Sequence, residues 1–547
     1  MRFSKGVVLL TLLIALLVPT MVFSGVSVFV TGTVRYDPTR AWNGFVILPG
    51  EGSAKLIDMN GNLVHEWDLK GGVGMPNKVY KGGYLFTSIF EPWADGTQDL
   101  NTVALLDWDG NIVRSFNKYY QVKKPSKGMP VEADGTAWIS RASHEWQIEG
   151  DPVGYYSPVA NADLKNGRWL IVGHQNPKVP KINKKVPLHD DVIYIVDKDG
   201  KVTWEWKPSD HFDELGLDKY PQTMALLGDN RHPLRGPVHV TEGHGLDWFH
   251  VNCASWLGPN KWYDQGDQGF HPENIVGDSR EMGFLYIIDH KTGKIVWMVK
   301  PPFDGEDAKL GNFYGPHHTH MIPRGLPGEG NILVFDNGGV SPFFPCLSGR
   351  YYTRVVEIDP VKKEIVWEYS HRTMIKGQWW HHGHQFFFSP FISLAQRLPN
   401  GNTFITEGAS NRLIEVTRQG EIVWEYVLPY RTTEDLPLAY TYRAYRVPYD
   451  YIPQLKKPRE VAVIPPENSQ IVLPNVEGVL PDYAPKVDKR PANQFKQPAP
   501  VQVPGIVIKS QDSSALSTGS AAKSGSGART MLPPTDKEEE EISTQRY

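Results

Sequence analysis

From Asn43 onward, hydrophobic and polar residues alternate in short runs that are broken by Asn-Gly, Asp-Gly or Gly-Lys turns. Alternation with a period of two predicts β-strands with one buried face, and these dipeptides between two such runs predict tight hairpins. One unit recurs: a strand, a turn, and a strand ending in Trp-Glu-aromatic or a relative of it. Its six copies span residues 54–67, 102–116, 192–206, 284–297, 354–369 and 412–426.

Several copies follow a second predicted strand pair built around a glycine turn, at residues 77–88, 161–174, 320–337 and 395–408. Each complete unit then has four antiparallel strands, and repeated units must stack to bury their apolar faces. Unequal spacing favours propeller blades over a solenoid. The sequence therefore predicts an all-β fold, a six-bladed β-propeller over residues 40–452, in which residues 440–451 supply the missing inner strand of the first blade. One extra strand pair at residues 129–141 makes seven blades the alternative.

The N-terminus reads as an export segment. Arg2 and Lys5 precede an uncharged apolar run, whose part from Val7 to Val18 has the length of a signal-peptide core and precedes a small-residue cleavage site near Gly25. Counted to Val30, the run is also long enough for an uncleaved membrane anchor. Residues 1–30 are thus a predicted signal peptide or anchor, and either one predicts a periplasmic or extracytoplasmic protein. Cleavage is left open.

Composition removes some classes of protein. The 57 basic and 61 acidic residues nearly balance, which argues against a nucleic-acid partner. The two cysteines, Cys253 and Cys346, exclude c-type haem and cysteine-rich zinc sites, and whether they pair is open. Residues 453–547 are rich in Pro, then in Ser, Gly and Ala, and end in a charged run, which predicts a disordered tail.

Histidines gather where three successive blades begin. Residues 315–339, GPHHTHMIPRGLPGEGNILVFDNGG, open one blade, residues 239–256 open the blade before it, and residues 377–391 open the blade after it. The leading ends of inner strands meet at one mouth of a propeller, so we expect these side chains to converge. They are His244, His250, Asn252, His317, His318, His320, His381, His382 and His384.

Arg280 lies where one of these blades passes from its second to its third strand. A planar guanidinium suits a tetrahedral oxyanion such as sulfate or phosphate. A neutral imidazole is a nucleophile toward sulfur or phosphorus, and a second one can act as a general acid or base. The chain has no Gly-x-Ser-x-Gly elbow and no phosphate-binding loop for a nucleotide donor, so no cofactor is predicted.

These residues resemble the bacterial arylsulfotransferases, the exported aryl-sulfate sulfotransferases that need no nucleotide donor. The matching pieces are DWFHVN at 247–252, SRxxxxLYIID at 279–289, the stretch 317–339 and the stretch 387–426. The resemblance implies an enzyme that passes a sulfuryl group from an aryl sulfate to a phenolic acceptor through a sulfated histidine. The physiological donor and acceptor and the oligomeric state stay open.

Carried over by residue, the resemblance implies that His250 and Asn252 form the family's His-x-Asn and that Arg280 binds sulfate. The sulfated histidine falls in the pair His317 and His318, and His318 is preferred because His318-Thr319 matches the family's His-Thr. Further substrate contacts are expected from flanking histidines and tryptophans. These are His244, Trp248, His320, Trp379, Trp380, His382 and His384.

Two departures from the family stand out. The family carries another functional histidine at the start of an earlier blade, where residues 155–167 show none, and His174 is the nearest substitute. An insertion, Trp262 to Asn274, separates His-x-Asn from Arg280. Other hypotheses are a non-enzymatic envelope propeller that binds a ligand, a metal site in the histidine cluster, and a quinone dehydrogenase on eight blades, which the blade count disfavours.

Overall fold

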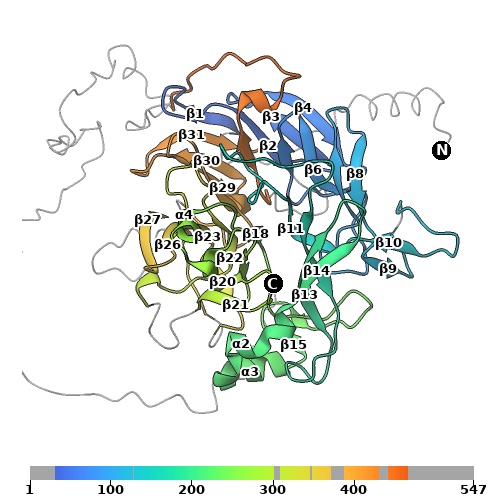
Figure 1. Ribbon diagram of the computed structural model, residues 1–547. Helices are drawn as coiled ribbons and strands as arrows, with labels where there is room; N and C mark the ends of the chain where they lie inside the picture. Colours follow the sequence, from blue (N-terminus) through green and yellow to red (C-terminus); the bar gives the residue numbers. More distant parts are fainter. Residues whose placement is uncertain are drawn as a thin grey trace, which may run out of the picture. The chain divides into compact units, whose positions relative to one another are not determined.

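The computed structural model describes residues 31–126, 128–300, 308–344, 348–370, 387–429 and 441–465. Within these ranges, six antiparallel sheets stand as blades in a ring (Figure 1). The predicted six-bladed β-propeller is confirmed. Each blade contains one of the six predicted hairpins as its third and fourth strands. The hairpin of the second blade is the copy that ends in Phe116.

The strands of the blades are as follows. Blade 1 holds β32 (Tyr445–Val447), β2 (Phe45–Pro49), β3 (Ser53–Ile57) and β4 (Leu63–Asp68). Blade 2 holds β5 (Lys78–Tyr80), β6 (Tyr84–Ile89), β7 (Thr102–Leu106) and β8 (Ile112–Phe116). Blade 3 holds β11 (Ala142–Ile148), β12 (Trp169–Gln175), β13 (Leu188–Val196) and β14 (Val202–Trp206), and β17 (Leu246–Asp247) pairs parallel to β13.

Blade 4 holds β18 (Ala254–Trp256), β19 (Ile275–Ser279), β20 (Phe284–Ile288) and β21 (Ile295–Val299). Blade 5 holds β22 (Pro316–Met321), β23 (Ile332–Asp336), β26 (Arg354–Asp359) and β27 (Glu364–Ser370). Blade 6 holds β28 (Leu394–Arg397), β29 (Thr403–Glu407), β30 (Arg412–Val416) and β31 (Ile422–Val427). First strands of neighbouring blades contact one another, as β18, β22 and β28 do, so they line the centre of the ring.

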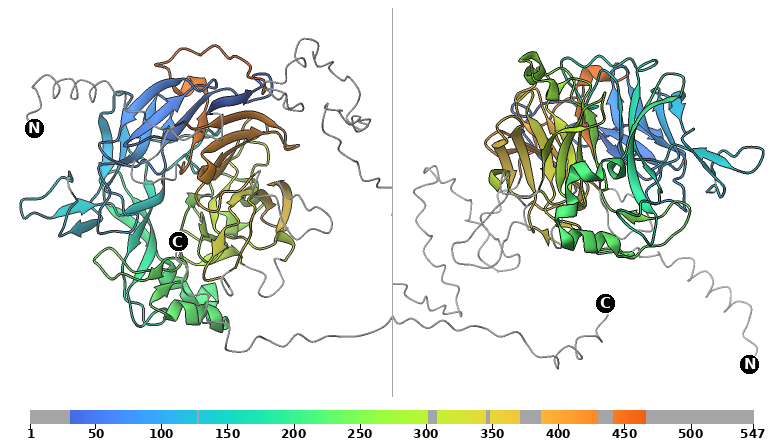
Figure 2. Two further views of the ribbon diagram at one scale, coloured as in Figure 1. Left: turned by 180° about the vertical axis from the view of Figure 1, so that it is seen from behind. Right: turned by 60° about the horizontal axis from the view of Figure 1, so that its bottom comes forward.

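Smaller elements decorate the ring. The hairpin of β9 (Tyr120–Val122) and β10 (Ala137–Ile139) projects from its side (Figure 2). It is a separate two-stranded sheet, so the extra strand pair near residues 129–141 does not make a seventh blade. Helices α2 (Phe212–Leu215) and α3 (Pro221–Gly228) follow blade 3, and α4 (Lys261–Asp264) lies inside blade 4. Two short ladders complete the set: β15 (Arg231–His232) with β16 (Gly236–Pro237), and β24 (Val340–Ser341) with β25 (Ser348–Gly349).

The ring closes through both ends of the described chain. β32 pairs antiparallel with β2, with Phe45 opposite Val447 and Ile47 opposite Tyr445, as the sequence predicted. In addition, β1 (Gly32–Tyr36) adds a fifth strand to blade 6 by pairing with β31. Each end of the chain thus completes a blade formed mostly by a distant part of the sequence.

The repeated tryptophan has a structural role that the hairpin motif alone does not reveal. In five blades its indole N–H donates to a carbonyl in the turn between the third and fourth strands of the next blade, at 2.7–3.0 Å. The pairs are Trp67 with Asp107, Trp206 with Gly293, Trp297 with Pro360, Trp367 with Arg418 and Trp424 with Met59. In blade 2, Phe116 takes the register position of Trp67 and Trp206. Arg114, at the register position of Trp297, Trp367 and Trp424, donates to the Asp197 carbonyl at 2.6 Å. All six junctions are therefore joined by a hydrogen bond of the same kind.

One strand pair was predicted wrongly. Residues 161–174 were expected to form both inner strands of blade 3, but only β12 lies there, and residues 149–168 form a loop. The innermost strand is β11, which precedes that loop and pairs with β12. This change matters for the site, because β11 carries His144.

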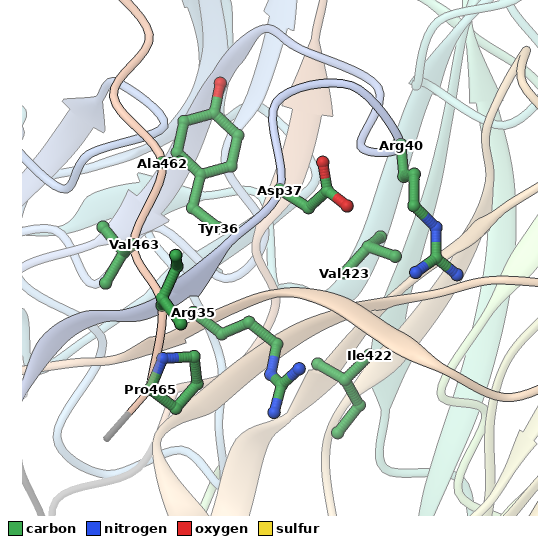
Figure 3. A pocket seen from close by; sticks show the side chains of 10 residues that line it. Arg35, Tyr36, Asp37, Arg40, Ile422, Val423, Ala462, Val463 and Pro465 are labelled. Atoms are coloured by element: carbon green, nitrogen blue, oxygen red, sulfur yellow. The ribbon is translucent and has the colours of Figure 1, made fainter. Parts of the chain in front are cut away.

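The first residues of the predicted tail run along the outside of the propeller. Val463 exchanges two backbone hydrogen bonds with Tyr36 of β1, at 2.8 and 2.9 Å. A pocket of about 330 Å³ lies beside this contact (Figure 3). No histidine lines it, since its walls are Arg35, Tyr36, Asp37, Arg40, Ile422, Val423 and residues 462–465. The predicted signal or anchor (1–30) and the tail from residue 466 lie outside the described residues, and no described helix is long and apolar enough to cross a membrane.

Candidate functional site

Three histidines lie at or next to the start of the inner strands of blades 3, 4 and 5. His144 lies in β11, His250 comes four residues before β18, and His318 lies in β22. Each has a positive φ, of 59°, 57° and 52°. A non-glycine residue rarely adopts this conformation, which costs about 1–3 kcal/mol and is concentrated at functional sites. In β11 and β22 the pairing register shifts at this point, so a bulge redirects the side chain.

His250 forms a dyad with a carboxylate. Its Nδ1 lies 2.8 Å from Asp247 Oδ2, and Arg235 forms an ion pair with the same carboxylate. Burial would raise the pKa of Asp247, but His250 and Arg235 together hold it well below its usual range. An ionised Asp247 accepts the proton of Nδ1, so Nε2 of the neutral imidazole carries the lone pair. Burial lowers the pKa of His250, although Asp247 opposes this shift.

Arg280 lies next to this dyad. Its backbone N–H donates to the His250 carbonyl at 2.9 Å, and its own carbonyl accepts from Ser341 Oγ at 3.2 Å. The same hydroxyl accepts from the Gly315 N–H, which ties Arg280 to the strand that carries His317. The guanidinium pairs with Glu281, and its side chain is 17 % exposed while that of Glu281 is fully buried. Blades 4 and 5 therefore hold Arg280 at a fixed place with part of its guanidinium accessible.

A pocket of about 310 Å³ opens beside Arg280. Most of its other walls are apolar or aromatic. They are Leu234, Gly339, Val340, Arg350, Tyr351, Phe388, Pro390 and Phe391. Arg350 is held by Asp336, Tyr352 and Asn312, and Arg280 pairs with Glu281, so both cations of this pocket have partners, and Arg280 is the more exposed of the two, at 17 % against 11 %. An aromatic ring with one anionic group matches such walls in both shape and charge.

The three histidines of β22 differ in their hydrogen bonds. His317 is engaged at both nitrogens: Nδ1 with Gly315 O and Asn337 Oδ1, and Nε2 with the Ile392 N–H at 3.1 Å. His320 is also engaged at both, with the His318 carbonyl and the Tyr155 hydroxyl.

His318 donates from Nδ1 to the Ala395 carbonyl at 3.1 Å. Its Nε2 makes one long contact within the described part of the chain, 3.5 Å to the Tyr445 hydroxyl. Its tautomer is thus fixed by blade 6, and Nε2 keeps its lone pair.

All three imidazoles are kept neutral. Burial, followed by the charges of nearby cations, lowers the pKa of His317 and His318 well below the usual range of histidine. Burial lowers that of His320 to about 3. Arg443, which precedes β32, contributes to all three shifts. Neutral imidazole is the nucleophilic form, so these histidines are in the reactive protonation state at neutral pH.

Asn252 and Arg443 connect the blades below this mouth. Asn252 Nδ2 donates to the Pro316 carbonyl at 2.8 Å, while its buried Oδ1 has no partner among the described residues. Arg443 donates to the Asn252 carbonyl at 2.8 Å and to Glu145 at 2.7 Å, and Lys78 pairs with the other oxygen of Glu145. Strands from blades 1 to 5 are thereby held together.

Residues 160–427 match the family model described as Arylsulfotransferase (ASST). This match supports the arylsulfotransferase family for the chain. No curated protein matches it.

Among solved structures, the chain is similar to a protein of unknown function from Bacteroides caccae (12 % identity, 74 % of this chain and 98 % of that chain, TM-score 0.35). It is also similar to the β-propeller domain of Cps50 (Swd1) from Myceliophteria thermophila (10 % identity, 74 % of this chain and 88 % of that chain, TM-score 0.33). A third similar structure is virginiamycin B lyase from Staphylococcus aureus (12 % identity, 74 % of this chain and 86 % of that chain, TM-score 0.30). The TM-scores of these three structures are below 0.5, so they say nothing about the function of the chain.

Both apparent departures from the arylsulfotransferase pattern have a structural explanation. The earlier blade does open with a histidine, His144, whose ring centroid lies 4.7 Å from that of His250. The expectation that this blade has none is wrong, because its inner strand was misplaced by the sequence reasoning. The ring centroid of His174, the expected substitute, lies 6.4 Å from that of His144.

The insertion forms a side loop. The chain leaves the sheet after Leu257, passes through α4, and returns where the Leu257 N–H donates to the Asn274 carbonyl at 2.9 Å. The side chain of Asn260 caps α4. Residues 258–273 therefore bulge from the β18–β19 ladder without separating His250 from Arg280, whose backbones are hydrogen-bonded.

The other residues predicted to contact the substrate differ in their surroundings, and several of them lie outside the described residues. Trp248 is fully buried in the core, donates to Asp190 at 2.8 Å and packs on Phe212 and Phe249, so neither of its faces is open to a substrate. His244 is half-buried and bonds Thr97 of blade 2 at 2.8 Å. The others lie outside the described residues: Trp379, Trp380, His381, His382 and His384, together with Cys346. Cys253 is buried.

Proposed function

We propose that this protein transfers the sulfuryl group of an aryl sulfate to a phenolic acceptor, with His318 as the residue that carries the group between the two half-reactions. The observation that carries the proposal is the difference among the histidines of β22. Both nitrogens of His317 and of His320 are engaged, whereas His318 has its Nδ1–H fixed by Ala395 and, among the described residues, its Nε2 lone pair held only by a 3.5 Å contact. The match of residues 160–427 to the arylsulfotransferase family model supports the reaction class.

In the first half-reaction, the Nε2 lone pair of His318 attacks the sulfur of the aryl sulfate. An N–S bond forms and the S–O bond to the aryl group breaks, so the electron pair leaves with a phenolate. Arg280 and the amide of Asn252 bind the sulfuryl oxygens, where negative charge is held throughout the transfer. The pocket beside Arg280 takes the aromatic ring.

In the second half-reaction, a phenolic acceptor replaces the leaving phenol. Nε2 of His250 accepts the hydroxyl proton as the phenol oxygen attacks sulfur, and the N–S bond breaks to restore neutral His318. The imidazolium that forms on His250 is stabilised by Asp247, 2.8 Å from its Nδ1. It then releases the proton to the solvent, from which the phenolate of the first half-reaction takes one, so the cycle closes with neutral His250 and a free phenol. His144, with its ring 4.7 Å from that of His250, completes the wall around the reacting sulfur.

The proposed reaction takes place outside the cytoplasm. The support is residues 1–30, whose basic start and apolar run have the form of a signal peptide or anchor. Fractionation of cells that express the whole chain tests this, because the protein would be in the cytoplasmic fraction if residues 1–30 do not export it. N-terminal sequencing of the exported protein then distinguishes cleavage from anchoring.

The sulfated residue can be captured directly. The protein is incubated with 4-nitrophenyl sulfate and no acceptor, and peptides are mapped by mass spectrometry at mildly alkaline pH. We expect a burst of one nitrophenol per protein and one sulfuryl adduct on His318. His318→Ala should lose both, while His317→Ala and His320→Ala should keep a reduced burst, because a covalent nucleophile has no substitute.

An adduct on His317 or His250 would move the nucleophile without changing the reaction. If the wild-type protein gives neither an adduct nor a burst with any aryl sulfate, the proposal is wrong. The non-enzymatic propeller that binds a ligand then remains, and equilibrium binding of the same aryl sulfate identifies it.

A further inference from the structure

A second group of ligand-type side chains lies between blades 2 and 3, apart from Arg280. It consists of Asp99, in the loop before β7, His174 on β12 and His189 on β13. Their donor atoms lie within 4.8 Å of one another, and all three residues are buried to at least 98 %. The arrangement joins a loop of one blade to two adjacent strands of the next.

The carboxylate of this group is firmly oriented. Arg141 donates from two nitrogens to Asp99 Oδ2, at 3.2 and 2.9 Å, and His174 Nδ1 lies 2.7 Å from Asp99 Oδ1. These bonds hold Oδ2 on the guanidinium of Arg141 and present Oδ1 toward the two imidazoles.

His189 is unpartnered inside this group. Neither of its ring nitrogens has a hydrogen-bond partner among the described residues, and both are buried. Its ring centroid lies 4.0 Å from that of His174. A buried polar atom without a partner destabilises a fold, so native proteins almost always supply a bonding group, a water or an ion. The unpaired nitrogens of His189 indicate that something binds here.

A second carboxylate points to a cation. Asp191 is two residues from His189 on β13, so both side chains lie on the same face, and it stands opposite His174 in the register of β12 and β13. Asp191 Oδ1 lies 3.8 Å from His174 Nε2, and its buried Oδ2 has no partner among the described residues. Two imidazoles and two carboxylates, one of them already neutralised by Arg141, form a donor set for a divalent cation.

We propose that Asp99, His174 and His189 bind one divalent transition-metal ion, with Asp191 as the carboxylate that orients His174 from its other nitrogen. Carboxylate-backed imidazole ligands of this kind are the rule in protein metal sites. The ion fastens the loop of blade 2 to blade 3 next to His144, whose ring lies 6.4 Å from that of His174. The site is separate from the proposed transfer chemistry and does not depend on it.

Two other groups of similar composition do not meet the same conditions. Asp247, His250 and Glu281 belong to the site described above and already have Arg235 and Arg280 as their cations. His271, Glu273 and His290 are half-buried at the surface, and there Glu273 pairs with Arg168 while His271 Nδ1 accepts the Glu273 N–H. That surface group serves as a control.

The test uses the purified full chain and Zn²⁺ and Co²⁺ as probes. After dialysis against a chelator, the protein is reloaded with Zn²⁺ and its metal content is measured by elemental mass spectrometry. We expect one equivalent of zinc in the wild type and in the His290→Ala control, and none in His189→Ala. Zn²⁺ should raise the Tm of the wild type and not that of His189→Ala. Co²⁺ should give the visible absorption of a site with mixed nitrogen and oxygen ligands.

If His189→Ala does not fold, Asp99→Asn and His174→Gln replace it, because each removes one donor while keeping the shape of the side chain. The proposal is overturned if the wild type takes up no stoichiometric zinc after reloading, which would mean that buried water partners His189. It is equally overturned if His189→Ala binds as much zinc as the wild type, or if His290→Ala abolishes binding.

Discussion

The side-chain amide of Asn252 donates a hydrogen bond to the main-chain carbonyl of Pro316, 2.8 Å away, and so ties the His-x-Asn segment of blade 4 to the strand of blade 5 that carries His317 and His318. An Asn side chain has two N–H donors. One holds β22 in place, and in the proposed reaction the other donates to a sulfuryl oxygen. In that reaction Asn252 couples the position of the proposed nucleophile to the binding of its substrate.

We expect Asn252→Asp to lose this coupling. The substitution keeps the size of the side chain, but an ionised carboxylate cannot donate to the Pro316 carbonyl and repels a sulfate. Loss of charge-assisted hydrogen bonds, at about 1.5–3 kcal/mol, predicts a fall in kcat/KM for aryl sulfate of about tenfold to a hundredfold or more. Steady-state kinetics measure this, and a variant with wild-type kcat/KM would exclude Asn252 from the site.

Arg280→Lys tests whether the guanidinium plane, and not merely its charge, binds the substrate. The backbone of Arg280 is fixed by His250 and Ser341, so a lysine would start from the same place. Loss of the planar fork predicts a decrease in kcat/KM of about tenfold or more. Arg324→Lys is the matched control, since Arg324 also pairs with a single carboxylate, that of Asp264. Equal kinetics for both variants would place the sulfate elsewhere.

His144 is a residue that the sequence reasoning missed, and its removal should reduce activity. Its ring lies 4.7 Å from that of His250, and burial, followed by the nearby histidines, holds its pKa well below the usual range. We expect His144→Ala to lower kcat/KM at least tenfold, on the scale of a lost acid–base or oxyanion contact. His65→Ala, on the outer strand β4, should leave it unchanged. If His144→Phe retains full activity, the ring serves only for packing.

The tryptophan bonds between blades predict a graded effect on stability. Trp424 is fully buried and donates to Met59 at 2.7 Å across the junction where the ring closes. Trp424→Phe removes the indole donor and leaves that carbonyl with only the longer bond from Thr33 Oγ1, at 3.2 Å, which should lower the free energy of unfolding by about 0.5–1.5 kcal/mol. The indole of Trp367 makes the same bond from a more exposed position, so Trp367→Phe should cost less. Denaturant titration compares them, and the reverse order would contradict this role.

What the sequence predicted well is what depends on local pattern. The six Trp-ending hairpins were found because their turns and alternation are contained within about fifteen residues each, and ring closure followed from one missing strand. Arg280 and His250 were placed together because both lie at fixed points of the same repeat. The intervening insertion, with α4 capped by Asn260, has no effect on that distance.

His144 was missed for a physical reason. β11 contains a bulge, with positive φ at Arg141 and His144, so its alternation of apolar and polar residues is broken. Its partner β12 follows a long loop, and inside that loop Asp163 forms a genuine turn through the N–H groups of Asn166 and Gly167. The sequence of this turn was therefore interpreted as a hairpin turn, although no strand directly precedes it. Trp248 was misjudged in the opposite sense, because an aromatic beside the His-x-Asn segment belongs to the core.

The pH dependence of the first half-reaction is predicted by the surroundings of His318. Burial, and then the charges of His320 and Arg443, lower its pKa well below the value near 6.5 of a free imidazole. Lowering the pH from 8 toward 6 therefore leaves the lone pair of Nε2 unprotonated, and only a more acidic solution protonates it. We expect the burst of nitrophenol to keep its rate across this range, whereas a solvent-exposed histidine would lose about half of its reactive form near pH 6.5.

Rapid-mixing measurements of the burst in buffers of equal ionic strength give the profile for the wild type and for Arg280→Lys, which retains the buried imidazole. A burst rate that falls with a midpoint near pH 6.5 in both proteins would show that the attacking nitrogen is not the buried one, and would exclude His318 as the nucleophile together with the likewise buried His250 and His144.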